Sequence, residues 1–344
     1  MLNQVKAALV LLIAVIAVLT VVAGLTDAMP ALSKANIIFF ILSSLIFIAS
    51  ILLWLLAWAL LLRNKKTGLC HTMLIGLGCV FAALTPVQVG ADALRSLKMK
   101  EKASIPYSES IGASMILKGL KFLIISLVAA FAFSVAFLSP SLGLWVKAAL
   151  VSGFAVVVLA ALLFLLPLNA AIGTKISLLF RALSGATGFS KRLSDYFLKY
   201  SAYLGKMPKK TLALVSLLSL ASLCLELAAF FTAFLSAGIM VPFYSVLTIF
   251  SILAILERTP FLPRGIGVVE AAAFILLSLQ GFVGAELNAG SIASVIIIFD
   301  VVRLVIPTLL SLLVYVLLSS EERIRAGTQA KTLPEATSRP RWKF

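Results

Sequence analysis

The sequence predicts an all-α polytopic membrane protein, and its composition and the lengths of its apolar segments carry that prediction. Of its 344 residues, 62% are hydrophobic and 12% are charged, whereas soluble domains have roughly half and a quarter. The mean hydropathy of +1.14 is too high for a soluble protein, whose surface would itself be apolar. The net charge of +16 fits basic cytoplasmic loops. This composition excludes a soluble enzyme, a nucleic-acid-binding protein and a disordered chain.

The first two apolar segments are long enough to cross a bilayer. The run at 5–26 has about the 20 residues that a span needs, and the apolar core of a signal peptide, the alternative, would be shorter. The run at 37–62 ends in a basic cluster, Arg63-Asn64-Lys65-Lys66. The positive-inside rule places this end, and therefore also the N-terminus, in the cytoplasm.

The next segment predicts a re-entrant hairpin. An apolar stretch at 69–84 stops at Thr85-Pro86, and Gly90 follows. Both flanks are basic, and 69–95 is too short for two crossings, which need about 40 residues. Non-helical backbone at membrane depth is tolerated only where it is buried in protein or lines a cavity. The break near Pro86 and Gly90 therefore indicates a functional region.

The middle of the chain predicts three spans and a basic connection. The segment 119–138 crosses outward, 144–166 returns, and 212–237 crosses outward again. Between them, 169–210 mixes basic and aromatic residues, which favours interfacial helices on an anionic leaflet over a solvated loop.

The segment 243–280 contains a second break, at Pro263, Gly265 and Gly267. It forms either a second hairpin or two full spans. In both cases 293–318 returns inward and leaves the C-terminus in the cytoplasm.

These segments amount to about six full spans plus two broken, re-entrant helical hairpins. We expect one integral membrane domain at 1–320 and a disordered, basic cytoplasmic tail at 321–344, in the cytoplasmic membrane. Pro86-x-x-x-Gly90 and Pro263-x-x-x-Gly267 are each followed by an acid. Two such hairpins of opposite orientation predict inverted repeats, whose broken helices meet near the midplane and form a substrate site.

Two motifs at these breaks resemble those of a known family, the flippase-like family named after the transmembrane region of lysylphosphatidylglycerol synthase. The first-half motif is Thr85-Pro86-Val87-Gln88-Val89-Gly90-Ala91-Asp92-Ala93-Leu94-Arg95. The segment Leu262-Pro263-Arg264-Gly265-Ile266-Gly267-Val268-Val269-Glu270 is similar to the family's second-half Pro-Gly-Gly-x-Gly-Val-x-Glu signature. The resemblance implies translocation of lipids or lipid-linked sugars, often beside a transferase.

Two residues depart from the family pattern. Arg264 stands where the family usually has a glycine, and Asp92 lies one residue later than the usual acid. The longest non-membrane stretch is also too short for an aminoacyl-transferase domain. We therefore expect no enzymatic activity from this chain.

Ionisable residues at membrane depth need partners or water, which makes them candidate site residues. Asp300 and Arg303 are three apart on one helix and can pair, whether for structure or for function. Arg264 and Arg303 are the expected partners of Glu270. Arg95 could instead snorkel to the interface. The candidate headgroup-binding residues are Asp92, Arg95, Glu226, Arg264, Glu270, Asp300 and Arg303.

The leading functional hypothesis is a translocator of phospholipids or polyprenyl-phosphate-linked lipids, with phosphate bound by arginine and by helix N-termini. The phosphate candidates are Arg95, Arg264 and Arg303. Alternatives are a non-catalytic membrane subunit that docks a glycosyl- or aminoacyl-transferase through 169–210, and a transporter of small anions. A lone histidine, His71, and three cysteines without ligand spacing predict no metal or cofactor.

Overall fold

The computed structural model describes residues 27–62, 68–84, 90–138, 144–165, 207–257, 265–279 and 287–332, with single residues at 9, 10, 12, 13, 172, 174, 175 and 178. These residues form helices and no strands. The helices are α2 (Met29–Ser33), α3 (Ile37–Leu62), α4 (Leu69–Gly78), η1 (Val80–Leu84), α5 (Gly90–Ala103), α6 (Tyr107–Leu138), α7 (Leu144–Leu165), α10 (Lys209–Ser236), α11 (Phe243–Glu257), α12 (Val268–Ser278), α14 (Ala289–Asp300), η5 (Val301–Val305) and α15 (Ile306–Thr332).

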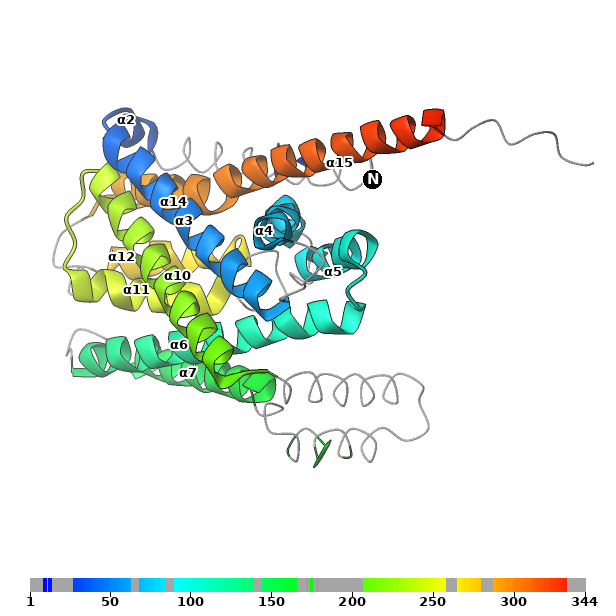
Figure 1. Ribbon diagram of the computed structural model, residues 1–344. Helices are drawn as coiled ribbons and strands as arrows, with labels where there is room; N and C mark the ends of the chain where they lie inside the picture. The colour runs from blue at the N-terminus through cyan, green and yellow to red at the C-terminus, as the bar shows by residue number, and fades with distance from the viewer. Residues whose placement is uncertain are drawn as a thin grey trace, which may run out of the picture.

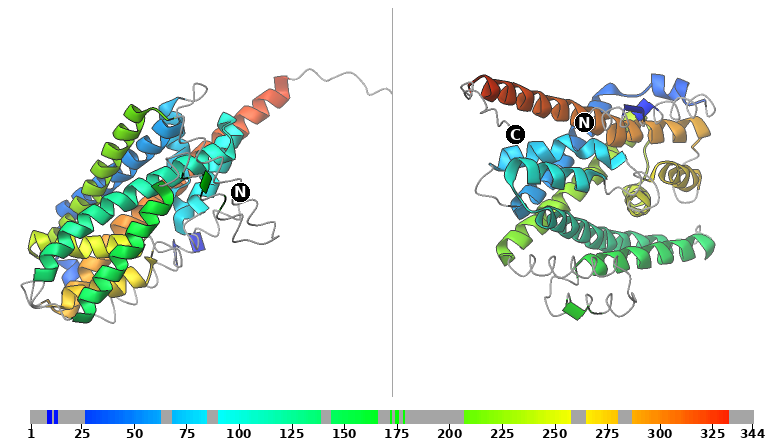
Figure 2. Two further views of the ribbon diagram at one scale, coloured as in Figure 1. Left: turned by 90° about the horizontal axis from the view of Figure 1, so that it is seen from below. Right: turned by 90° about the vertical axis from the view of Figure 1, so that its right-hand side faces the viewer.

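Helices α3 and α10 form a close pair that runs diagonally across the molecule (Figure 1) and lies side by side in a second view (Figure 2). Small polar residues let the two backbones approach. The hydroxyl of Ser43, which is fully buried, donates to the carbonyl of Ala229 at 2.7 Å. Such small residues are the usual contact between membrane helices, because lipid supplies no hydrophobic drive for association.

Two pairs of short helices lie at opposite ends of this bundle (Figure 1). One pair comprises α5 and the helix formed by α4 and η1, and the other comprises α11 and α12. The apolar helices Leu69–Leu84, Phe243–Glu257 and Val268–Ser278 are too short to be counted as spans. The 15 residues of α11 extend about 22 Å, less than the roughly 30 Å of a bilayer core.

Each short pair packs against the long helices of both halves of the chain. Helix α5 contacts α6, while α4 and η1 contact α15; helix α12 contacts α14, while α11 contacts α6. Residues beside the two breaks also meet. Leu84, the last residue of η1, packs with Leu304 of η5 and with Ile266 in the second break. The residue that precedes the first break thus lies in the same cluster as Ile266 of the second.

The helix at Ala289–Ser320 is continuous but contains a π-helical turn, η5. Pro307 follows this turn. Because proline has no N–H, it offers no hydrogen bond to the carbonyl of Arg303, four residues back. Single π turns occur frequently at functional sites, and this one holds Arg303.

The described residues contain four helices that are long and apolar enough to cross a membrane: Ile37–Leu62, Tyr107–Ser134, Lys209–Ser236 and Ala289–Ser320. Their outward faces are apolar, as at Leu127, Phe131 and Leu217. The interior includes a buried aromatic group in which Phe230 packs edge-on against Phe234 and Phe299. An apolar surface around an apolar core is suited to lipid.

Several elements extend beyond their predicted bounds. Helix α6 begins at Tyr107 instead of 119, and α5 continues past Arg95 to Ala103. The second case reflects an amphipathic helix, in which Met99 and Ala103 are buried. Helix α15 continues to Thr332, past the predicted start of the tail.

Some predictions fall outside the described residues. These are most of the first span at 5–26, nearly all of the basic segment 169–210, and Pro86, Pro263 and Arg264.

Candidate functional site

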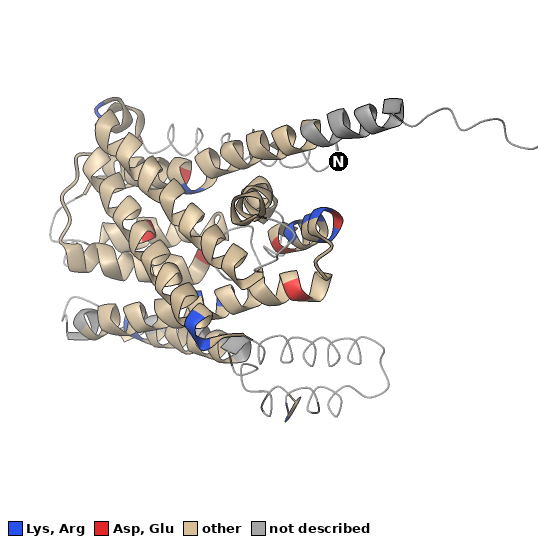
Figure 3. Cartoon of the chain, in the orientation of Figure 1, with Lys and Arg blue, Asp and Glu red and all other residues tan. Residues whose placement is uncertain are grey.

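Charged residues are sparse on the helices and gather at a few places (Figure 3). Six of the predicted site residues belong to three clusters: Asp92 and Arg95; Glu226; and Glu270, Asp300 and Arg303. Each of these acids pairs with a basic residue, and Glu270 and Asp300 share Arg303.

The Arg303 cluster lies where α12 meets the π turn. The Nε atom of Arg303 donates to Asp300 Oδ1 at 2.7 Å, and its Nη2 atom donates to Glu270 Oε1 at 2.5 Å. Arg303 and Asp300 are each 2% exposed. This confirms the pairing of Asp300 with Arg303 and identifies Arg303 as a partner of Glu270. Charge-assisted bonds of this kind are among the strongest hydrogen bonds in proteins.

The second break positions Glu270. Gly265 has φ +68° and Gly267 has φ +91°, a conformation that L side chains rarely adopt. A Cβ atom on Gly265 would lie 2.6 Å from Val269 Cγ2 and 2.9 Å from Glu257 Cα. Glu270 Oε2 accepts from the backbone N–H of Gly267. One carboxylate therefore caps α12 and binds Arg303.

A small pocket adjoins this cluster. Its lining includes Glu270, Asp300, Phe230 and Phe299, and its free volume of about 10 Å³ is room for about one water molecule. Among the described residues, no group of histidine, cysteine, aspartate or glutamate could hold a metal ion.

The Arg95 cluster lies after the first break. The Nη2 atom of Arg95 donates to Asp92 Oδ1 at 3.0 Å, and its Nε atom donates to the carbonyl of Ala91 at 3.2 Å. Lys118 of α6 pairs with the other oxygen of Asp92. The guanidinium also lies over the rings of Trp54 and Trp58, 4.5 and 5.3 Å from their centroids, where cation–π attraction is favourable.

Arg95 does not snorkel. It is only 3% exposed, because Asp92 and the two tryptophan rings hold the guanidinium inside the bundle. The interpretation of Arg95 as an interfacial side chain was therefore wrong.

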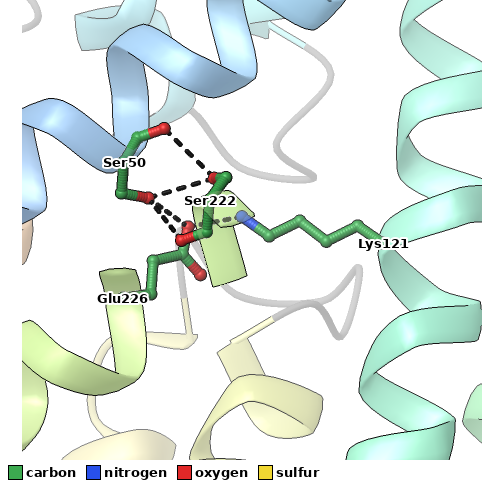
Figure 4. Close-up of polar contacts among 4 residues, drawn as sticks. All are labelled: Ser50, Lys121, Ser222 and Glu226. Atoms are coloured by element: carbon green, nitrogen blue, oxygen red, sulfur yellow. Dashed lines mark hydrogen bonds and ion pairs between the residues drawn. The ribbon is translucent and has the colours of Figure 1, made fainter. Parts of the chain in front are cut away.

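The third cluster joins α3, α6 and α10 (Figure 4). Glu226 Oε1 accepts from Lys121 Nζ and, at 3.3 Å, from the hydroxyl of Ser50. Ser50 and Ser222 each donate to the other's carbonyl, at 2.9 and 3.1 Å. The sequence indicated Glu226 as a candidate but did not indicate Lys121, Ser50 or Ser222 as its partners. The available signal was the spacing of Lys118 and Lys121, three apart on one helix.

All three clusters link different helices by an ion pair that the protein largely shields. A buried ion pair is held in place because separation exposes each charge to an apolar environment. A ligand with a charged headgroup can replace one partner and keep the other charge neutralised. The clusters can therefore bind an ionic group.

Comparison with known proteins identifies the family of this chain. No curated protein and no solved structure matches the chain. Residues 7–318 match the family described as the lysylphosphatidylglycerol synthase TM region. Because this match covers most of the 344 residues, the multi-pass membrane protein belongs to the lysylphosphatidylglycerol synthase TM region family, whose membrane domains are related to lipid handling.

Proposed function

We propose that this protein translocates a phospholipid or a polyprenyl-phosphate-linked lipid across the cytoplasmic membrane. The observation that carries the proposal is that Leu84, which precedes the first break, and Ile266 of the second break pack in one cluster with Leu304, next to a buried arginine whose acidic partners lie on two different helices. A lipid translocator needs such a shielded polar place for the headgroup, while the acyl chains stay in the bilayer.

The packing supports inverted repeats as the basis of this function. The first repeat comprises α3, the α4–η1–α5 pair and α6, and the second comprises α10, the α11–α12 pair and α14–α15. In each repeat an acid in the first turn after the break pairs with a base on the following long helix, Asp92 with Lys118 and Glu270 with Arg303. Repeats of this kind place substrate sites between their broken helices.

The headgroup phosphate would bind Arg303 in exchange for a carboxylate. A guanidinium presents paired N–H groups that match phosphate oxygens. Glu270 is the carboxylate that can leave, because its side chain is 21% exposed whereas that of Asp300 is 3% exposed. Asp300 then remains as the counter-ion that keeps Arg303 oriented. This exchange needs no catalytic step and no cofactor.

The charge distribution supports both termini in the cytoplasm, since most Lys and Arg residues fall in the loops and tail assigned there. The second candidate function is a membrane subunit that docks a separate transferase. It rests on the basic, aromatic segment 169–210, which would bind such a partner or the anionic leaflet.

The test is movement of headgroup-labelled lipids in proteoliposomes, followed with an impermeant quencher. We expect wild type to translocate a phosphate-bearing lipid, and Glu270→Gln and Arg303→Ala to lose this activity. The matched control is Glu101→Gln, because it removes the same charge from an exposed ion pair, with Lys98. If wild type moves no anionic, neutral or polyprenyl lipid, or if Glu101→Gln is as inactive as Glu270→Gln, the proposal fails.

A further inference from the structure

Helix α6 carries a line of polar residues that the two clusters at its side only partly explain. Ser110, Ser114, Lys118 and Lys121 follow one another at helical spacing and so share one face. We call these four residues the α6 track. It runs from the first turn of α6 to the Glu226 pair in the middle of the α3–α6–α10 contact.

The two lysines of the α6 track pair with acids of its neighbours. Lys118 pairs with Asp92 of α5 and Lys121 with Glu226 of α10. Helices α5 and α6 are neighbours joined by a short turn. Ser96 lies one helical turn after Asp92 on α5, and Ser114 lies one helical turn before Lys118 on α6. Along the chain, both serines therefore lie between the Asp92–Lys118 pair and that turn.

Several buried polar atoms around the track have no hydrogen-bond partner in the described part of the chain. They are Arg95 Nη1, Trp58 Nε1 and the hydroxyls of Ser96, Ser110 and Ser114. The hydroxyl of Ser114 lies near the carboxylate of Asp92, which it stabilises as a donor would. Burying a polar group without a hydrogen-bond partner destabilises the protein, so this interface favours a state that supplies partners.

Other buried serines of the long helices do not share this property. Ser126 lies further along α6, is 4% exposed and donates to the carbonyl of Phe122 at 2.8 Å. Ser219 of α10 donates in the same way to Val215. These hydroxyls bond to the preceding turn of their own helix, which is the usual solution. The serines of the track make no such bond to the preceding turn.

Charged groups also gather beside the track. In the described part of the chain, Arg95 and Lys118 both pair with Asp92, and Lys121 pairs with Glu226. An anion between α5 and α6 would accept hydrogen bonds from the donors that lack partners.

We infer that the α6 track is the path of a phosphate-bearing lipid headgroup, with its water, between the first turn of α6 and the Lys121–Glu226 pair. The path opens when α5 separates from α6. This inference rests on the proposed function and adds the route to it.

The experiment uses single cysteines in the full-length protein in detergent, with Cys70, Cys79 and Cys224 replaced by alanine. Ser114→Cys reports on the track, and Ser126→Cys is the control because it lies on the same helix at similar burial. We expect an anionic methanethiosulfonate to modify Ser114→Cys about tenfold faster than Ser126→Cys, since reaction requires an accessible thiolate. We also expect a cationic reagent of similar size to react more slowly at Ser114→Cys, and Lys118→Gln to reduce that difference.

Equal rates at the two cysteines, or faster reaction with the cationic reagent, would overturn the inference. Added phosphatidylglycerol should slow modification of Ser114→Cys, whereas inorganic phosphate at the same concentration should not. Equal protection by inorganic phosphate, or no protection by the lipid, would remove the lipid headgroup as the occupant. The labelling result does not depend on transport: a reactive track without lipid movement in liposomes refutes the proposed function, and lipid movement with an unreactive track refutes the path.

Discussion

Replacement of Arg303 by methionine is the sharpest test of the buried network. Methionine keeps much of the side-chain volume but leaves the carboxylates of Asp300 and Glu270 without the base they bind at 2.7 and 2.5 Å. Because Asp300 is 2% exposed, water cannot fully replace that base. Removing one partner of a buried ion pair costs about 3–5 kcal/mol, so we expect Arg303→Met to lose about that much stability.

A triple variant separates charge from packing. Glu270→Gln, Asp300→Asn and Arg303→Met together leave no unpaired charge, and glutamine can still accept from the N–H of Gly267. We expect this variant to recover most of the lost stability, because replacing a whole buried network is often close to neutral.

The assay is thermal unfolding in detergent, followed by tryptophan fluorescence at several pH values. The deficit of Arg303→Met should shrink as the pH falls, since protonation of the buried Asp300 carboxylate removes its unpaired charge. The exposed-pair variant Glu101→Gln should change stability by less than about 1 kcal/mol. A deficit for Arg303→Met that is no larger than this, that does not depend on pH, or that persists unchanged in the triple variant would refute the reasoning.

Three further predictions concern the backbone, the helix contact and the cysteines. Gly265→Ala should lower the melting temperature far more than Gly68→Ala. A Cβ atom at position 265 would lie 2.9 Å from Glu257 Cα, whereas a Cβ atom at position 68 would have nothing within 4 Å. Equal shifts in melting temperature would contradict this. Ser50→Leu should destabilise the protein by roughly 1–3 kcal/mol through overpacking at the α3–α10 contact, whereas Ser50→Ala should destabilise it by about 0.6 kcal/mol. Unfolding in detergent measures both values, and a Ser50→Leu protein as stable as Ser50→Ala would contradict close packing at this contact. A maleimide should label exposed Cys70 and leave buried Cys79 unlabelled in the folded protein, as mass spectrometry of the labelled chain would show; equal labelling would contradict that burial.

The sequence was sufficient for the helical membrane class and for the positions of both breaks. Apolar length identifies α3 and α10, and the glycines of the second break mark the turn before α12. The pairing of Asp300 with Arg303 also follows from spacing alone. These are local properties, and each one can be derived from a short window of residues.

The remaining features depend on contacts between distant segments. Hydropathy alone begins α6 at 119, because it counts Lys118 as a loop charge and cannot anticipate that Asp92 neutralises it. The same limit hid the pairing of Lys121 with Glu226 and the burial of Arg95 between two tryptophans. A charge in an apolar helix can be assigned to the membrane only when its partner is known.

Ser311 of α15 has a consequence for the order of assembly. Its hydroxyl accepts from the N–H of Phe81 at 2.9 Å and donates to the carbonyl of Leu77 at 2.7 Å, where α4 gives way to η1. These bonds join residues separated by 230 and 234 positions. During synthesis the first hairpin therefore enters the bilayer long before the helix that completes its hydrogen bonding has left the ribosome. Before α15 arrives, the N–H of Phe81 and the carbonyl of Leu77 can bond to each other, because they are four residues apart as in an α-helix. Insertion of the Ser311 hydroxyl between them therefore couples the docking of the last helix to the local conformation of the first hairpin.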